Sequence, residues 1–84
     1  MDIESETRKI LDEALGLHGR SAAFVRATPL LGAVPELDSM AVLAVLTLLE
    51  ERFGFAIDDD EIDGETFASF GSLTSFVARK LAHA

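Results

Sequence analysis

The chain has 84 residues, enough for one small domain with a single hydrophobic core, and we expect residues 1–84 to form that one domain. Seven Lys and Arg against fifteen Asp and Glu give a formal net charge of −8, which disfavours binding to nucleic acid or to an anionic membrane and favours partners with basic patches. The chain has no cysteine, so neither disulfide bonds nor a thiolate metal site can hold the fold together.

The amino-terminal segment, MDIESETRK, is charged and mostly acidic, unlike the basic and then apolar layout of a secretory signal peptide. The longest largely apolar run, from Met40 to Leu49, is too short to cross a bilayer. We therefore expect a cytoplasmic protein.

A first helix is predicted over residues 3–17, because apolar residues recur there at helical spacing and charged residues occupy the other face. Gly16 and Gly19 indicate where this helix ends. The apolar stripe consists of Ile3, Ile10, Ala14 and Leu17, with Leu11 and Leu15 beside it.

Residues 18–38 have no regular period, because glycines and prolines interrupt any helix. The segment is nevertheless too apolar for a free linker, and we expect an ordered loop that lies across the core. A loop of this length in so small a domain is unusual and often functional. Its apolar residues are Phe24, Val25, Leu30, Leu31 and Val34.

A second helix is predicted from Ser39 to Phe53, ending at Gly54. Its apolar residues follow the i, i+3, i+4, i+7 spacing of a buried helical stripe. They are Val42, Val45, Leu46, Leu49 and Phe53.

The rest of the chain predicts an acidic turn with a short third helix in residues 55–67, and then a closing helix through Leu81 that Ser69 or Ser72 can cap. No segment alternates apolar and polar residues for long enough to indicate a strand. The expected fold is all-α: a small antiparallel four-helix bundle with a long first loop and a short third helix.

The acidic run from Asp58 to Asp63 partly matches the ligand pattern of the EF-hand calcium loop. With Asp59 as the first position, acidic side chains and Gly64 match the early positions of that loop. The twelfth position is Phe70, which cannot coordinate a cation. A solvated acidic turn is the better interpretation, and we expect no metal site.

No catalytic residues are expected either. A nucleophilic triad needs a histidine that can reach the serine. His18 lies at the predicted end of the first helix and His83 lies next to the carboxyl terminus. Because a chain of this size also leaves little room for a substrate pocket, an enzyme is not expected.

Asp38 and Ser39 stand at the start of the second predicted helix. A serine at this position can cap the helix, or its exposed hydroxyl can hold a phosphate, since the helix N-terminus stabilises an anion. Asp38 is available to cap the helix, which would leave the hydroxyl of Ser39 free to point outward.

The motifs that surround this serine resemble those of the acyl carrier protein family. LDSM opens the apolar helix and LEERFGF closes it, and both IDDDEID and TFASFGSLTSFVARKL match the family's later segments. The family's hallmark is Asp-Ser-Leu, and here Met40 replaces the leucine with little change of volume. The resemblance extends from the first helix to Leu81.

This resemblance implies that Ser39, flanked by Asp38, holds 4′-phosphopantetheine, which a phosphopantetheinyl transferase would attach from coenzyme A. The thiol of that arm would hold acyl groups as thioesters for fatty acid, polyketide or specialised lipid synthesis. Separate enzymes with basic patches would load and transfer the acyl groups. The carrier itself would be a monomer and not an enzyme.

The resemblance also indicates roles for two sets of residues. The first could part to shelter an acyl chain and consists of Val42, Val45, Leu46, Leu49, Phe53 and Ile57. The second would bind partner enzymes and consists of Glu36, Asp38, Met40, Leu43, Ala44, Thr47, Glu50 and Glu51. Because Ala41 and Ala44 stand where the family usually has acids, a specialised member with its own partners is expected.

Two alternatives remain open. A peptidyl carrier protein usually has two glycines before the serine, whereas this chain has Glu36, Leu37 and Asp38. In an acidic helical adaptor that is not an enzyme, Ser39 would only cap its helix.

Overall fold

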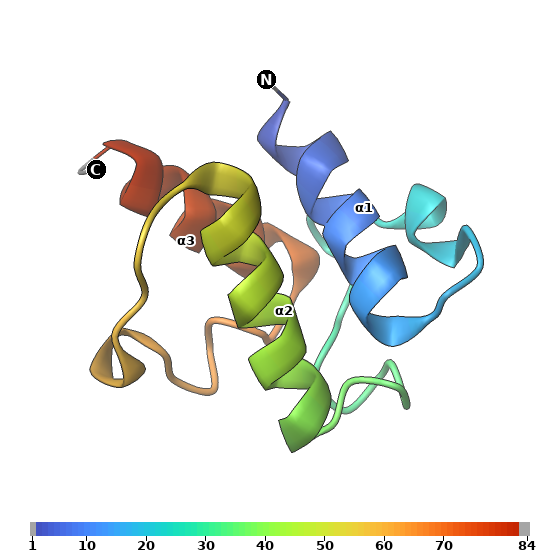
Figure 1. The fold of residues 1–84 in the computed structure, drawn as a ribbon. Helices are drawn as coiled ribbons and strands as arrows, with labels where there is room; N and C mark the ends of the chain where they lie inside the picture. The colour runs from blue at the N-terminus through green and yellow to red at the C-terminus, as the bar shows by residue number, and fades with distance from the viewer. Residues whose placement is uncertain (1, 83–84) are drawn as a thin grey trace.

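A computed structural model of the chain describes residues 2–82 and shows an all-α fold, as predicted (Figure 1). Within this range there are three α-helices, so the prediction of a four-helix bundle is wrong in its number of helices. They are α1 (Ile3–Leu15), α2 (Ser39–Phe53) and α3 (Phe70–Ala82), with short 3-10 turns at η1 (Arg20–Ala23) and η2 (Asp59–Glu61).

The first helix is two residues shorter than predicted. Asp2 caps its amino end by accepting a hydrogen bond from the backbone N–H of Glu4 at 3.1 Å. Gly16 ends it with a left-handed backbone, φ 63°, which glycine adopts without strain. Leu17 therefore lies beyond the helix, although its side chain is buried as expected.

The predicted short third helix is the single 3-10 turn η2. The backbone returns to an extended conformation at Ile62, with φ −106° and ψ 131°. Directly after it, the carboxylate of Asp63 accepts hydrogen bonds from the backbone N–H groups of Glu65 at 2.9 Å and Thr66 at 3.1 Å. Such local side-chain bonds compete with helical ones, which explains why no helix continues here.

The third helix, α3, begins with a reciprocal pair of serines. The hydroxyl of Ser69 accepts a hydrogen bond from the N–H of Ser72 at 3.1 Å, and the hydroxyl of Ser72 accepts one from the N–H of Ser69 at 3.0 Å. Both of the serines predicted as possible caps therefore take part.

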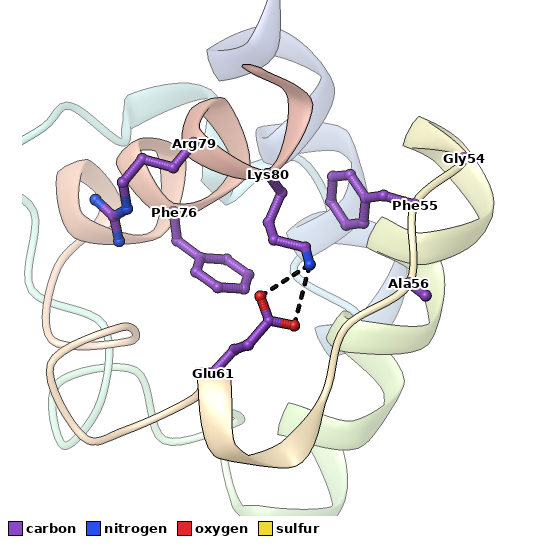
Figure 2. A pocket seen from close by; sticks show the side chains of 7 residues that line it. All are labelled: Gly54, Phe55, Ala56, Glu61, Phe76, Arg79 and Lys80. Carbon is purple, nitrogen blue, oxygen red and sulfur yellow. Dashed lines mark hydrogen bonds and ion pairs between the residues drawn. The ribbon is translucent and has the colours of Figure 1, made fainter. Parts of the chain in front are cut away.

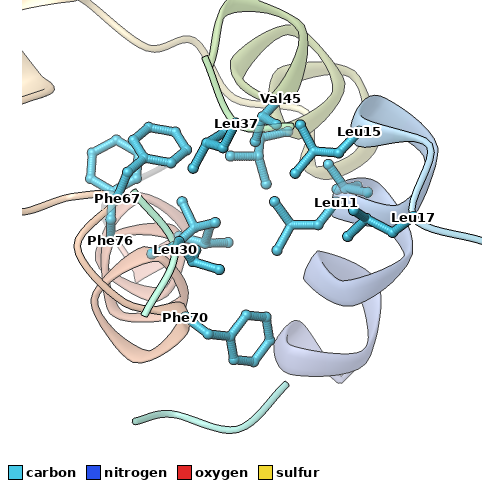
Figure 3. Close-up of a cluster of buried hydrophobic side chains, with 13 residues drawn as sticks. Leu11, Leu15, Leu17, Leu30, Leu37, Val45, Phe67, Phe70 and Phe76 are labelled. Carbon is cyan, nitrogen blue, oxygen red and sulfur yellow. The ribbon is translucent and has the colours of Figure 1, made fainter. Parts of the chain in front are cut away.

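The core lies where α1 packs against α2 and α3 (Figures 1 and 3). Residues outside the helices contribute more buried apolar side chains to it than α2 does, because Leu30, Leu37 and Phe67 are buried beside the helices. The buried apolar residues are Ile10, Leu11, Leu15, Leu17, Leu30, Leu37, Val45, Leu49, Phe67, Phe70, Leu73, Phe76 and Val77.

The long loop is ordered by pairing with the segment that precedes α3. The N–H of Leu30 donates to the carbonyl of Ala68 at 3.1 Å, and the N–H of Phe70 donates to that of Thr28 at 2.8 Å. Leu30 is fully buried, as expected for a loop across the core. The same expectation is wrong for Val25 and Leu31, which are 58% and 49% exposed.

None of the helices in residues 2–82 combines the length and the apolar character needed to cross a membrane.

Candidate functional site

Asp38 caps the amino end of α2. Its backbone is extended, and one carboxylate oxygen accepts a hydrogen bond from the N–H of Ala41 at 2.8 Å. Its own carbonyl accepts the first helical hydrogen bond, from the N–H of Val42 at 2.9 Å. The side chain of Ser39 is not needed for the cap, because a carboxylate oxygen and the carbonyl of Asp38 accept the first hydrogen bonds of the helix.

Ser39 is the first residue of α2 and is exposed. Within residues 2–82 its hydroxyl makes no hydrogen bond, whereas the hydroxyls of Ser69 and Ser72 bond to each other. The helix N-terminus beside it favours a negative charge, since the first-turn N–H groups and the helix dipole point there. A phosphate on this oxygen would therefore be exposed to solvent, and its negative charge would be stabilised by the N-terminus of α2.

The residues just before the cap are held in place from two sides. Leu37 is buried in the core, with 5% of its surface exposed. Arg20 donates one hydrogen bond to the carbonyl of Leu17 at 3.1 Å and another to the carboxylate of Glu36. The guanidinium of Arg20 lowers the pKa of Glu36, with a further contribution from a backbone hydrogen bond.

Neither of these two anchors, Leu37 and Arg20, was predicted from the sequence. A signal for Leu37 was present, because an apolar residue before the cap commonly packs on the fourth helical residue, here Val42. Arg20 gave no such signal, since its contact with Glu36 joins residues sixteen apart in the chain.

The four uncharged residues among those predicted to bind partners form a largely apolar surface beside Ser39. Met40 is 74% exposed and Leu43 is 59% exposed, and Ala44 and Thr47 are exposed next to them. The first charged residue of α2 is Glu50, about three turns after Ser39. We call Met40, Leu43, Ala44 and Thr47 the apolar patch of α2.

The carboxylates of the same predicted set are mostly engaged within the protein. Glu36 is paired with Arg20, and Asp38 caps the helix. Glu50 accepts a hydrogen bond from the N–H of Ile57 at 2.8 Å. Of these four acids only Glu51 has no hydrogen bond or ion pair to any of the residues 2–82.

The residues predicted to shelter an acyl chain lie in or against the core. Val45 and Leu49 are fully buried. Val42, Leu46, Phe53 and Ile57 are partly buried and pack on the same cluster. Whether they part to admit an acyl chain stays a prediction.

Within residues 2–82, His18 makes no hydrogen bond to Ser39. His18 is exposed in the turn after α1, with a left-handed backbone at φ 54°. His83 lies outside the described residues. Likewise, no group of three or more His, Cys, Asp or Glu side chains within residues 2–82 is arranged to hold a metal ion.

Comparison with known proteins decides the family. No family model and no curated protein matches the chain. Among solved structures, the solution NMR structure of a holo acyl carrier protein from Nitrosomonas europaea is 48% identical, with a TM-score of 0.90. The match covers 99% of this chain and 100% of that one. The chain belongs to the acyl carrier protein family. This confirms the family that the motifs around Ser39 predicted from the sequence.

Proposed function

We propose that this acyl carrier protein is modified at Ser39 with 4′-phosphopantetheine and presents acyl groups to separate enzymes of fatty acid, polyketide or related lipid synthesis. The similar protein from Nitrosomonas europaea is described as the holo form. When attached, the arm supplies a thiol that holds an acyl group as a thioester. The protein itself contributes position and recognition and is not an enzyme.

The observation that supports this proposal is that Asp38 caps α2 and Ser39 does not. Asp38 caps α2 through its bond to the N–H of Ala41, and the hydroxyl of Ser39 remains exposed. In the modification, Ser39 Oγ forms a bond to the phosphorus that bears pantetheine. The pyrophosphate bond of coenzyme A breaks, adenosine 3′,5′-bisphosphate leaves, and the hydroxyl proton passes to a base of the transferase.

The residues around Ser39 fit a phosphodiester. The N-terminus of α2 offers a favourable field for one negative charge. Leu37 is buried in the core and fixes the backbone before Ser39, whereas Met40 after it is exposed. Ser39 therefore lies at a well-ordered, solvent-accessible position on the protein surface. Such a position suits a group that must enter the active sites of other proteins.

The test is incubation with coenzyme A and a promiscuous phosphopantetheinyl transferase, followed by intact-mass measurement. The unchanged protein should gain one phosphopantetheine, and Ser39→Ala should gain none while remaining folded. Ser69→Ala is a control that should still be modified. An unchanged mass for the natural sequence would favour the adaptor alternative, and modification of Ser39→Ala would place the attachment elsewhere.

A further part of the proposal concerns partners. The net charge of −8 should attract enzymes with basic patches over a distance. At short range the apolar patch of α2 should make the contacts, because the carboxylates of Glu36, Asp38 and Glu50 are already engaged within the protein. We therefore propose a dedicated set of partner enzymes.

A further inference from the structure

A cavity of about 570 Å³ opens at the end of α2 that is remote from Ser39 (Figure 2). It lies between the segment after α2, the turn η2 and the last turns of α3. Its volume is within the range of about 300–1,000 Å³ that is typical of small-molecule sites. Since α2 has 15 residues, the cavity is about 22 Å from the start of that helix at 1.5 Å per residue.

The apolar part of the cavity is aromatic. Phe76 is 4% exposed and belongs to the core, so its ring is fixed. Phe55 is partly buried and stacks on Phe53, with ring centroids 5.9 Å apart and planes 9° from parallel. Ala56 lines the opening and is exposed. These surfaces can take up an apolar group of a ligand.

Two cations line the same cavity, and only one of them is neutralised. The ammonium of Lys80 binds both carboxylate oxygens of Glu61, at 2.8 and 3.0 Å. Arg79 is exposed and makes no hydrogen bond or ion pair to residues 2–82. In the view of Figure 2 the ring of Phe76 lies between Arg79 and the pair of Lys80 with Glu61.

Arg79 is exceptional among the basic side chains of this acidic protein. The other six Lys and Arg residues each lie within ion-pair distance of a carboxylate in the described range. The pairs are Arg8 with Glu4, Lys9 with Glu6, Arg20 with Glu36, Arg26 with Glu4, Arg52 with Glu6 and Glu13, and Lys80 with Glu61. Arg79, the one guanidinium with no such partner among residues 2–82, thus lines an aromatic cavity.

We propose that this cavity is a second ligand site, separate from Ser39, for a small carboxylate with an apolar body. The body would lie against Phe55 and Phe76, and the carboxylate would accept hydrogen bonds from Arg79. Arg79 also borders a neighbouring hollow that contains Glu61, Asp63 and Glu65. Because these acids repel anions, a small anion without an apolar body should bind poorly.

The test uses octanoate as the probe and follows backbone amide signals by NMR. Octanoate should shift the signals of Gly54, Ala56 and Arg79 in a saturable way. Octanol, which lacks the charge, should bind more weakly, and inorganic phosphate, which lacks the apolar body, should not compete. Shifts that instead centre on Val45 and Leu49 would show that octanoate enters the core and would overturn the proposal.

Two variants test the charge and the volume of the cavity separately. Arg79→Gln should weaken octanoate binding about tenfold through loss of charge-assisted hydrogen bonds. Ala56→Leu should weaken it by filling the opening without a change of charge. Lys9→Gln on α1 removes the same unit of charge and should leave the affinity unchanged. Equal weakening by Lys9→Gln and Arg79→Gln would mean that only net charge matters, and the site would be rejected.

The site does not depend on the proposed carrier function. Ser39→Ala should therefore bind octanoate with the same affinity as the natural sequence. Loss of octanoate binding in Ser39→Ala would show that the two sites are one. A protein that is modified at Ser39 but binds no octanoate would retain the proposed function and refute only the second site.

Discussion

The carboxylate of Asp38 lies 2.8 Å from the backbone nitrogen of Ala41 and closes the first turn of α2 without help from Ser39. The two neighbouring residues therefore have separable roles. Asp38 stabilises the helix, whereas the hydroxyl of Ser39 makes no hydrogen bond to the residues 2–82 that the structure describes.

The first prediction follows from this separation. Asp38→Ala should lower the free energy of unfolding by about 1 kcal/mol, as expected for a lost cap. Ser39→Ala should change it by less than about 0.5 kcal/mol, because an exposed hydroxyl without partners is removed. Urea denaturation of both variants, with Asp38→Asn as a control that keeps a capping oxygen, measures the difference. A larger loss for Ser39→Ala than for Asp38→Ala would contradict the assignment of the cap.

A second prediction concerns Gly71, where α3 touches the long loop. A Cβ atom at this position would lie 2.7 Å from the carbonyl oxygen of Arg26, which also accepts the N–H of Gly71 at 2.9 Å. Gly71→Ala should therefore destabilise the protein by about 1–3 kcal/mol, as overpacking of a core does, even though alanine is the better helix former.

Gly64→Ala is the matched control for this substitution. A Cβ atom at Gly64 would meet nothing within 4 Å, and its backbone is not left-handed. Its unfolding transition should stay close to that of the natural sequence. If Gly71→Ala proved as stable as Gly64→Ala, the contact between the loop and α3 would not be as tight as described.

Local chemistry explains which parts of the fold could be predicted. The bounds of α2 follow from a capping residue, Asp38, and from Gly54, whose left-handed φ of 76° ends the helix. Both signals act within one turn, and the prediction of Ser39 to Phe53 was right. The same holds for the pair of serines that begins α3.

The errors come from contacts between residues distant in the chain. Whether Leu30 or Leu31 faces the core depends on the pairing of the loop with residues 67 and 68, which no local pattern reveals. The anchor from Arg20 to Glu36 is of the same kind. A short helix was predicted beside the acidic turn of residues 55–67, but the hydrogen bonds of Asp63 favour a turn in place of that helix.

A third prediction concerns acid conditions. The backbone N–H of Asp58 and then the ammonium of Lys80 lower the pKa of Glu61 from its ordinary value of 4.5. A carboxyl group whose pKa is lowered by folding stabilises the protein above its unfolded pKa and loses that effect as the pH falls through the folded value. Glu61 should therefore contribute to stability at neutral pH and lose this contribution below pH 4.5.

Removal of Lys80 tests the two causes. In Lys80→Gln the pKa of Glu61 should rise but remain below 4.5, because the bond from Asp58 persists at 2.7 Å. An NMR titration of the glutamate side-chain carbons measures this directly. The pKa of Glu36, which Arg20 lowers, should not move and is the internal control. A pKa of Glu61 that is unchanged in the variant would show that Lys80 has no part in the shift.

A fourth prediction concerns cargo. Acyl chains of increasing length on the arm should shift the NMR signals of Val42, Leu46 and Ile57, which are only partly buried and can move aside more easily than the fully buried Val45 and Leu49. The arm without an acyl group is the control and should affect only Ser39 and its neighbours. Shifts confined to those neighbours at every chain length would mean that the chain stays outside the core.

The last prediction concerns partner choice and depends on the apolar patch of α2. Enzymes of a general fatty acid synthase that bind acidic residues beside the arm should turn over this carrier slowly. Acids can be introduced at Ala44 and Thr47, which are exposed, but not safely at Ala41, which is partly buried and packs on the core. Ala44→Glu combined with Thr47→Glu should raise turnover by such synthase enzymes about tenfold at low salt, through faster association.

The gain in the double variant should shrink as salt is added, because screening weakens the new charge contacts. Ala44→Gln combined with Thr47→Gln has the same size without the charge and is the matched control. A housekeeping acyl carrier protein gives the upper reference for turnover. If the natural sequence already reached that reference, an apolar patch would be no barrier to general enzymes, and the proposal of dedicated partners would fail.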